Sequence, residues 1–201
     1  MKMAVKRERT LELAHRQGIL RAADVVPLGI SASYLSKLSE KGYLQRVGRG
    51  LFSAPDPEFT EHRSLVEAAA YAPKAIVCLL SALAFHGIGT QLPHAVWLAI
   101  GLKDRPPRVP TAPVEVVRMG LRFLYEGVET YKIEGIPVRI TSPAKTIVDC
   151  FKYRSRVGMD VALEALREGL RDRRFTSDEL YYYAKLDRVW NIVKPYAEAI
   201  L

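Results

Sequence analysis

The sequence predicts an α+β protein in which an N-terminal winged helix-turn-helix domain precedes a larger mixed α+β domain. Residues 1–53 read as three short helical stretches followed by a β-prone hairpin. Two prolines then interrupt the pattern, and the remaining residues mix helical segments with short apolar strands. At 201 residues, the chain is long enough for one or two domains with a buried core.

Composition excludes several protein classes. With 49% apolar and 26% charged residues, the chain is ordinary for a folded soluble protein and unlike disordered, collagen-like or coiled-coil chains. The apolar run from Ala75 to Phe85 is shorter than the roughly 20 residues that a membrane-spanning helix needs. The basic N-terminus is not followed by the apolar stretch of a signal peptide. Two cysteines without C-x-x-C spacing favour a reduced, cytoplasmic compartment.

Charge divides the chain unequally. Residues 1–53 contain 10 lysines and arginines against four acids, a net charge of +6, whereas the remaining 148 residues carry +2. Pro55 and Pro57 follow directly and predict an extended linker. We therefore expect a DNA-binding domain at 1–54, a linker at 55–60 and a second domain at 61–201. The alternative is that the basic segment is a solvated surface without a partner.

Three helices are predicted in the first domain. The first spans Arg7–Gln17 and ends at Gly18, and the second spans Ala22–Val26. Ser31 is placed to cap a third helix that reaches about Lys41, because its hydroxyl can accept a hydrogen bond from an otherwise unpaired backbone N–H. On this third helix, Leu35 and Leu38 share an apolar face. Small polar and cationic residues occupy the opposite side, as a recognition helix requires.

Residues 43–52 predict a hairpin whose tip is Gly48-Arg49-Gly50. A basic hairpin after a helix-turn-helix is the wing of a winged helix, and its arginines would lie along the DNA backbone or minor groove. The alternative is that the hairpin merely covers the three-helix core. The predicted DNA-contacting residues, from the outer face of the third helix and from the wing, are Ser31, Ser33, Tyr34, Ser36, Lys37, Lys41, Arg46 and Arg49.

The first half of the second domain mixes helices and strands. Ser64 and Glu67 have the spacing of a capping box at the start of a helix. Residues 75–80 are an apolar run compatible with either strand or helix. The segments expected after it are a helix at 81–86 stopped by Gly87, strands at 96–100 and 114–119 separated by a proline-rich basic loop at 103–113, and a hairpin formed by 131–133 and 138–140.

The second half is predicted to be helical. Ser142-Pro143 places an N-cap hydroxyl before a proline at the first helical position, and that helix should run to about Tyr153. A further helix is expected from Asp160 to about Arg173. Thr176 and Glu179 open the last helix with a capping box, and Pro195 should kink or end it. Arg171, Arg173 and Arg174 read as a solvated helix end, with a second DNA contact as the alternative.

Catalytic motifs are absent from the sequence. It contains neither a G-x-x-x-x-G-K-[ST] phosphate loop nor a G-x-S-x-G nucleophile elbow, and its four histidines show no metal-ligand spacing. A helix followed by Gly87-Ile88-Gly89-Thr90 and a strand is the layout of nucleotidyltransferases. Those enzymes hold metal with paired carboxylates on that strand, and Val96-Trp97-Leu98 has none. We therefore expect no enzyme activity, no catalytic residue, no metal and no cofactor.

Two pairs of residues with potentially catalytic side chains have simpler explanations than catalysis. Ser81 and His86 lie five residues apart on one predicted helix, which separates them by about 140° and makes a nucleophile–base pair a poor hypothesis. Lys145 and Asp149 are four residues apart, which favours an exposed ion pair worth a few tenths of a kcal/mol. An enzymatic second domain that uses these four residues is nevertheless retained as a competing hypothesis.

Several runs resemble AbiEi-type antitoxins. In the first domain the resemblance rests on Ile30-Ser31, Leu35, Gly42-Tyr43-Leu44 and the run from Arg46 to Phe52. In the second domain it rests on the runs 80–87, 92–97 and 141–151. The resemblance implies a transcriptional regulator of a type IV toxin–antitoxin pair that aborts phage infection. Such antitoxins repress their own operon by binding inverted repeats in double-stranded DNA near the promoter.

The resemblance also implies partners. The paired toxin of the family is a nucleotidyltransferase, which the C-terminal domain counters, generally without a stable complex, so direct contact is left open. Inverted repeats admit a homodimer on DNA. The alternatives are an orphan regulator whose second domain only dimerises, and an enzyme that acts on the toxin or its targets.

Overall fold

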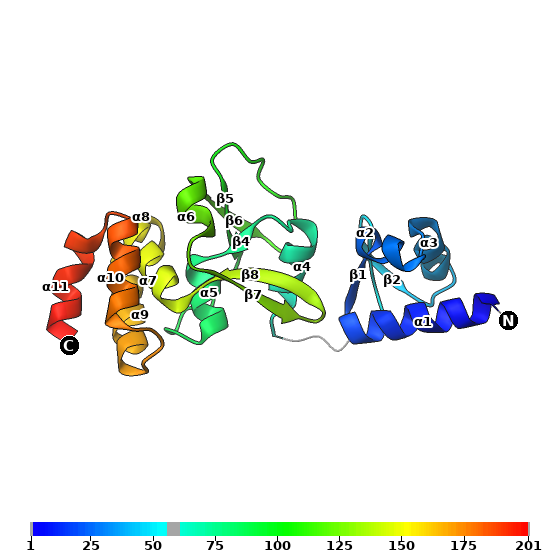
Figure 1. The fold of residues 1–201 in the computed structure, drawn as a ribbon, viewed down its shortest axis with the longest axis horizontal. Coiled ribbons are helices and arrows are strands. Elements are labelled where there is room, and N and C mark those ends of the chain that lie inside the picture. Colours follow the sequence, from blue (N-terminus) through cyan, green and yellow to red (C-terminus); the bar gives the residue numbers. More distant parts are fainter. Residues whose placement is uncertain (1, 56–60, 201) are drawn as a thin grey trace. The chain divides into compact units, whose positions relative to one another are not determined.

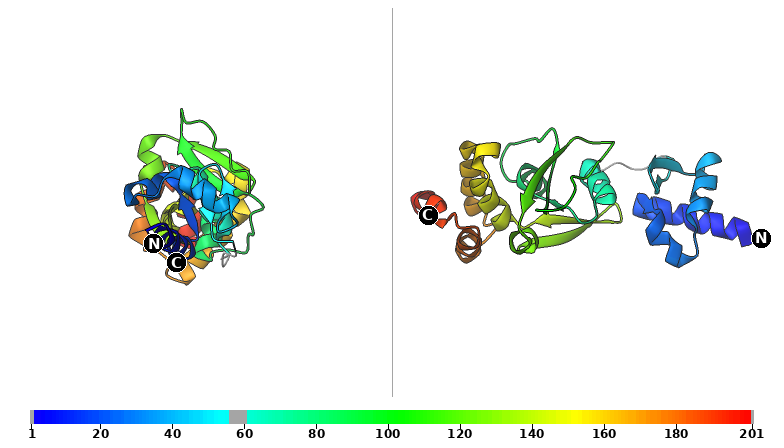
Figure 2. Two further views of the ribbon diagram at one scale, coloured as in Figure 1. Left: turned by 90° about the vertical axis from the view of Figure 1, so that its right-hand side faces the viewer. Right: turned by 90° about the horizontal axis from the view of Figure 1, so that it is seen from above.

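The computed structural model describes residues 2–55 and 61–200, drawn in Figure 1 and from two further directions in Figure 2. The chain divides into two compact units, Met1–Pro73 with Lys132–Pro137, and Lys74–Tyr131 with Val138–Leu201. Of the predicted linker at 55–60, residues 56–60 lie outside the described residues.

The first unit contains a winged helix (Figure 1). Its elements in chain order are α1 (Lys2–Gln17), β1 (Ile19–Arg21), α2 (Ala22–Val25), the 3-10 turn η1 (Val26–Leu28), α3 (Ala32–Glu40), β2 (Gln45–Gly48), β3 (Leu51–Ser53) and α4 (Arg63–Tyr71). The three strands form an antiparallel sheet in the order β1-β3-β2. The predicted helices and hairpin are confirmed, although α1 begins earlier than expected.

Strand β1 was not predicted from the sequence. It has only three residues and lies between the left-handed Gly18 and the start of α2. Its identity as a strand depends on β3, with Ile19 opposite Ser53 and Arg21 opposite Leu51. A segment this short carries no periodicity of its own, so only the distant partner strand defines it.

An apolar cluster supports the winged helix. Leu35 and Leu38 of α3 are buried as predicted, and they pack with Leu20, Val25 and Phe52 from the surrounding elements. The cap of α3 is also confirmed, because the Ser31 hydroxyl accepts a hydrogen bond from the Tyr34 backbone N–H at 3.3 Å. The orientation of α3 is therefore fixed by its apolar face and by its first turn.

The predicted capping box at the start of α4 is wrong. The helix begins at Arg63, with His62 in the cap position, so Ser64 lies inside the first turn. The Glu67 carboxylate is bound at 2.7 Å by the Arg63 guanidinium, one helical turn away. That ion pair occupies the group that would have reached back to the backbone in a capping box.

The second unit is built on a five-stranded mixed sheet in the order β6-β5-β4-β8-β7. The strands are β4 (Ile76–Val77), β5 (Val96–Gly101), β6 (Val114–Met119), β7 (Val128–Ile133) and β8 (Ile136–Thr141). Strand β4 is antiparallel to β5 and parallel to β8, and β5 is parallel to β6. The ambiguous run at 75–80 contains both elements, because β4 ends before α5 begins at Leu79.

Seven helices accompany the described strands of this sheet. They are α5 (Leu79–His86), α6 (Leu121–Tyr125), α7 (Pro143–Lys152), α8 (Arg154–Val157), α9 (Met159–Arg171), α10 (Ser177–Leu186) and α11 (Trp190–Ile200). Helix α7 contacts α5, α9 and α10, and every residue from Ala144 to Phe151 is buried. In Figures 1 and 2, helices α9 to α11 lie together on one side of the sheet, with α11 outermost. Helix α7 is therefore the centre of the core of this unit.

The predicted helix ends of this unit are only partly correct. The capping box of Thr176 and Glu179 is confirmed, with both reciprocal hydrogen bonds present. Pro143 occupies the first turn of α7 as predicted, but the buried Ser142 hydroxyl caps nothing and has no hydrogen-bond partner among the described residues. Cys78 and Cys150 are buried and free. No helix in the described part of the chain is long and apolar enough to cross a membrane.

Pro195 does not break the last helix. The chain breaks earlier, at Asp187–Val189, where Arg188 takes a left-handed backbone conformation (φ 59°). Pro195 then lies inside the separate helix α11. Pro195 is the sixth residue of α11, so its missing N–H removes one interior hydrogen bond of the helix without ending it.

Candidate nucleic-acid interface

The outer face of α3 has the composition of a recognition helix. Ser33, Lys37 and Lys41 are exposed, whereas Leu35 on the opposite face is fully buried. Tyr34 is half-buried and packs against the apolar cluster. The face therefore offers cations and small side chains to a groove while its tyrosine anchors the helix to its own domain.

The serines of α3 have structural partners. Ser31 caps the helix, and its hydroxyl also lies 3.1 Å from the Ser33 hydroxyl. The Ser36 hydroxyl donates to the Ala32 carbonyl at 3.2 Å. Since each hydroxyl is already bound to a backbone group or to a neighbouring hydroxyl, the serines serve a groove mainly as small side chains that allow close approach.

Two cations of α1 hold both ends of the α3 segment, and sequence analysis missed them. The Lys6 ammonium donates to the Gly29 carbonyl at 2.6 Å and lies 5.1 Å from the centre of the Tyr34 ring. The Arg7 guanidinium lies 4.9 Å from the centre of the Tyr43 ring and donates to its hydroxyl at 3.2 Å. These contacts span more than twenty residues of sequence, so helical periodicity gives no signal for them.

The wing carries the second set of predicted contacts. Strands β2 and β3 meet at Arg49-Gly50, where Gly50 has a φ of 72°, a conformation that glycine adopts without strain. Arg46 and Arg49 are exposed, and the Arg46 Nε donates to the Gly48 carbonyl at 3.3 Å. Strand β2 contacts α3. The arginines of the wing and the cations of α3 thus belong to elements that pack directly together.

One known family resembles part of this unit. Residues 8–55 match the model of the family described as transcriptional regulator, AbiEi antitoxin. Over these residues, which contain the winged helix, the chain is similar to the AbiEi antitoxin family. The match confirms the resemblance found in the first domain and supports a transcriptional regulator of the antitoxin type, whereas the resembling runs of the second domain lie outside the matched residues. The match lies in the first unit and does not extend to the second unit. A comparison with curated proteins finds no match.

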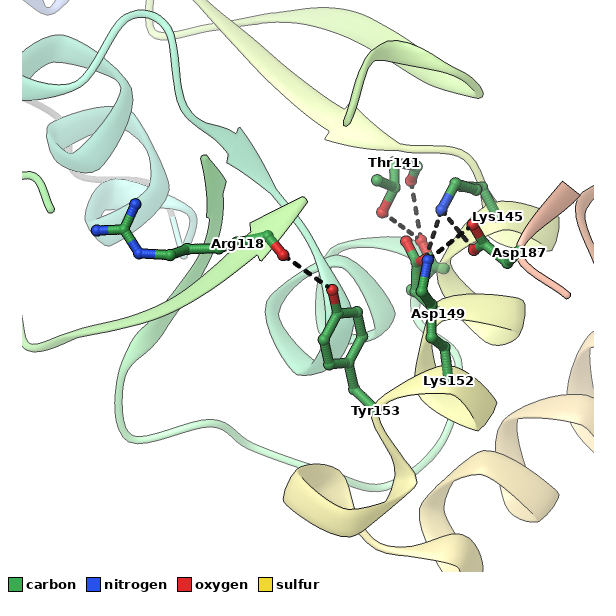
Figure 3. A network of polar contacts seen from close by, with 8 residues as sticks. Arg118, Thr141, Lys145, Asp149, Lys152, Tyr153 and Asp187 are labelled. Atoms are coloured by element: carbon green, nitrogen blue, oxygen red, sulfur yellow. Dashed lines mark hydrogen bonds and ion pairs between the residues drawn. The ribbon is translucent and has the colours of Figure 1, made fainter. Parts of the chain in front are cut away.

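The second unit buries the charged pair that was predicted to be exposed (Figure 3). The Lys145 ammonium lies 2.5 Å from Asp149 Oδ1 and 2.9 Å from Asp187 Oδ2, and all three side chains are fully buried. Lys152 binds the other Asp187 oxygen at 3.1 Å. The exposed-pair prediction is wrong because α10 and the turn after it cover α7 from a distant part of the sequence.

Electrostatics in this network favour a structural role. Burial raises the pKa of Asp149 to about 7, against the opposing effect of Lys145. Burial alone would raise the pKa of Asp187, but Lys145 and Lys152 hold it below its ordinary value. The two carboxylates raise the pKa of Lys145 although burial opposes its charge. The network thus joins α7 to the α10–α11 turn by ion pairs that no solvent reaches.

Ser81 and His86 each bind backbone groups of neighbouring segments. The Ser81 hydroxyl donates to the Ala95 carbonyl and accepts from the Trp97 N–H at 3.0 Å. The His86 Nε2 lies 2.8 Å from the Thr141 carbonyl, and burial lowers its pKa. Both side chains connect α5 to neighbouring strands. Among the described residues, no group of three or more His, Cys, Asp or Glu side chains could hold a metal ion.

Proposed function

We propose that this protein is a DNA-binding antitoxin that represses its own operon through the winged helix of its first unit. The observation that carries this proposal is the exposed cationic face of α3 beside the basic wing, in a unit that matches the AbiEi transcriptional regulators. Helix α3 enters the major groove of double-stranded DNA, and Arg46 and Arg49 of the wing bind the backbone or the minor groove.

The contacts divide by role. Lys37 and Lys41 meet phosphates or guanine edges, while Ser31, Ser33 and Ser36 allow close approach of α3 to the DNA. Tyr34 anchors the helix. A homodimer places two such units on inverted repeats at the promoter, so that half-site spacing follows the symmetry of the protein. The protein acts in the cytoplasm without a cofactor.

The second part of the proposal concerns the toxin. The second unit counters a nucleotidyltransferase toxin without being an enzyme itself. Support for the absence of catalysis is local: the Ser81 and His86 side chains serve packing, and Lys145 and Asp149 are fully buried where no substrate reaches them. Neutralisation needs no stable complex of the two proteins under this proposal.

DNA binding is tested by titrating the full-length protein against a duplex of its own promoter over a salt series. We expect Lys37→Ala and Arg46→Ala each to weaken binding and to flatten the slope of log affinity against log salt by about one unit. Lys74→Ala, which removes an exposed lysine of the second unit, is the matched control. Affinity and slope equal to the control in both variants would contradict the assigned contacts.

Autorepression and toxin neutralisation are tested in cells. A reporter fused to the promoter should be repressed by the wild-type protein and released by Lys37→Ala with Arg46→Ala. Growth in the presence of the paired nucleotidyltransferase should be restored equally by wild type and by this double variant, because only the first unit is altered. Loss of rescue in the double variant would refute the separation of roles, and rescue by no form would refute the antitoxin proposal.

A further inference from the structure

The connection between β5 and β6 is unusual for its topology. The two strands are parallel neighbours, paired from Val96 opposite Val114 to Gly101 opposite Met119, so the chain must return along the full length of the strands. Such crossovers commonly contain a helix. Here residues 102–113 form neither helix nor strand, and four of them are prolines. Prolines restrict the unfolded chain, so holding this segment in one shape costs less entropy than it would for other residues.

The base of this connection is tied down by its own hydrogen bonds. The Asp104 carboxylate accepts from the Gly101 N–H at 2.9 Å. Arg118 of β6 donates through one nitrogen to three carbonyls, those of Gly101, Leu102 and Asp104, at 3.2, 2.9 and 2.7 Å. One arginine thus organises the start of the connection, and the Asp104 carboxylate is bound to a backbone N–H of the same turn rather than to a cation of the connection.

The cations of the connection are left unneutralised. Lys103, Arg105 and Arg108 are exposed and form no hydrogen bond or ion pair with the part of the chain that the structure describes. The adjacent acid on β6, Glu115, is already bound by Arg156 at 2.8 Å. In contrast, Lys145 of the same unit is fully paired. Three positive charges therefore project from this scaffold, and no acid in the described ranges 2–55 and 61–200 is bound to them.

We propose that this segment, Lys103–Pro113, is a second DNA-binding element that contacts the phosphate backbone of double-stranded DNA. Its chemistry is that of backbone contacts: lysine and arginine meet phosphate oxygens and neutralise them without reading the bases. It lies on neither a recognition helix nor a wing, so its contribution is independent of sequence. The inference rests on the proposed DNA-binding function and extends that function to the second unit.

The test compares two triple variants of the full-length protein. One carries Lys103→Ala, Arg105→Ala and Arg108→Ala, and the control carries Lys74→Ala, Arg167→Ala and Lys194→Ala, which removes the same charge from other exposed positions of this unit. Each is titrated over a salt series against promoter duplex, a random duplex of equal length and single-stranded RNA. The loop variant should lower the salt slope by about two to three units on both duplexes. Slopes equal to the control would overturn the inference.

A third variant separates this inference from the proposed function. Lys37→Ala, Arg46→Ala and Arg49→Ala together should reduce the preference for promoter over random duplex, which the loop variant should leave unchanged. If only the loop variant weakens binding, the winged-helix contacts fail and the loop inference stands. An effect of the loop variant confined to RNA would overturn the inference, and failure of the wild type to bind either duplex would overturn both proposals. All loop substitutions are at exposed positions, and unfolding curves in urea verify the fold.

Discussion

Helices α3 and α7 have similar sequence patterns, but their polar residues lie in opposite environments. Each is a short amphipathic helix with a lysine among its polar residues. In α3, Lys37 is exposed and only Leu35 and Leu38 are buried. In α7, Lys145 and its partner Asp149 are as completely buried as the apolar residues around them. The difference teaches that the pattern of a helix defines its apolar face, whereas distant elements decide whether its polar face meets solvent, a ligand or the protein itself.

Lys145→Ala is expected to have the largest effect on stability. The substitution leaves two buried carboxylates, Asp149 and Asp187, without the ammonium that joins them, and such losses cost about 3–5 kcal/mol. The free energy of unfolding is measured by urea denaturation. Lys194→Ala, which breaks an exposed pair with Glu198, is the control and should cost less than about 1 kcal/mol. Equal effects of the two substitutions would show that the network is not buried in solution.

The pH dependence of stability sharpens the same comparison. Because the pKa of Asp149 is raised from 3.8 to about 7 on folding, the folded protein binds more protons than the unfolded chain between these values. This group therefore stabilises the fold below about pH 4, and its contribution falls as the pH rises to about 7, by at most about 1.4 kcal/mol per pH unit. Asp187, whose pKa is lowered on folding, loses its stabilising contribution only at more acidic pH.

The measurement is the difference between the stability curves of wild type and Asp149→Asn over pH 4 to 8. His86, whose pKa is lowered, contributes a slope of opposite sign near pH 6, but it is present in both proteins and cancels in the difference. The free energy of unfolding of the wild type minus that of Asp149→Asn should decrease as the pH rises. A flat difference would mean that Asp149 is ionised throughout and that its charge is fully balanced by Lys145.

In both units the sequence predicted much of the local structure, but it did not predict which distant segments pack against that structure. The caps at Ser31 and Thr176, the apolar face of α3 and the β5 and β6 strands follow from short-range rules. Strand β1 depends on its pairing with β3. The burial of Lys145 depends on Asp187, which is 42 positions away. Contacts of this range leave no periodic trace, and for the same reason the Lys6 and Arg7 supports of α3 were missed.

Ser31→Ala tests the local rules at intermediate magnitude. Loss of the cap hydroxyl should destabilise the first unit by about 1 kcal/mol, because the Tyr34 N–H loses its side-chain acceptor. Ser36→Ala is the matched control, since its hydroxyl only returns to the Ala32 carbonyl within the helix. The two variants are compared by hydrogen exchange, which measures how far each substitution lowers the protection of the α3 amides. Greater loss of protection in Ser36→Ala than in Ser31→Ala would contradict the capping geometry.

Lys37→Ala should have the smallest effect on stability, within about 0.5 kcal/mol, because an exposed lysine on a helix surface supports little of the fold. Lys37→Ala and Lys145→Ala thus compare two lysines on short helices. We expect Lys145 to be needed for folding but not for DNA binding, and Lys37 to be needed for DNA binding but not for folding. Urea denaturation and promoter binding, measured on the same two variants, give the four values required. If Lys37→Ala lowers the free energy of unfolding by as much as it weakens DNA binding, the weaker binding reflects an altered fold. Lys37 would then have a structural role in α3, as Lys145 has in α7.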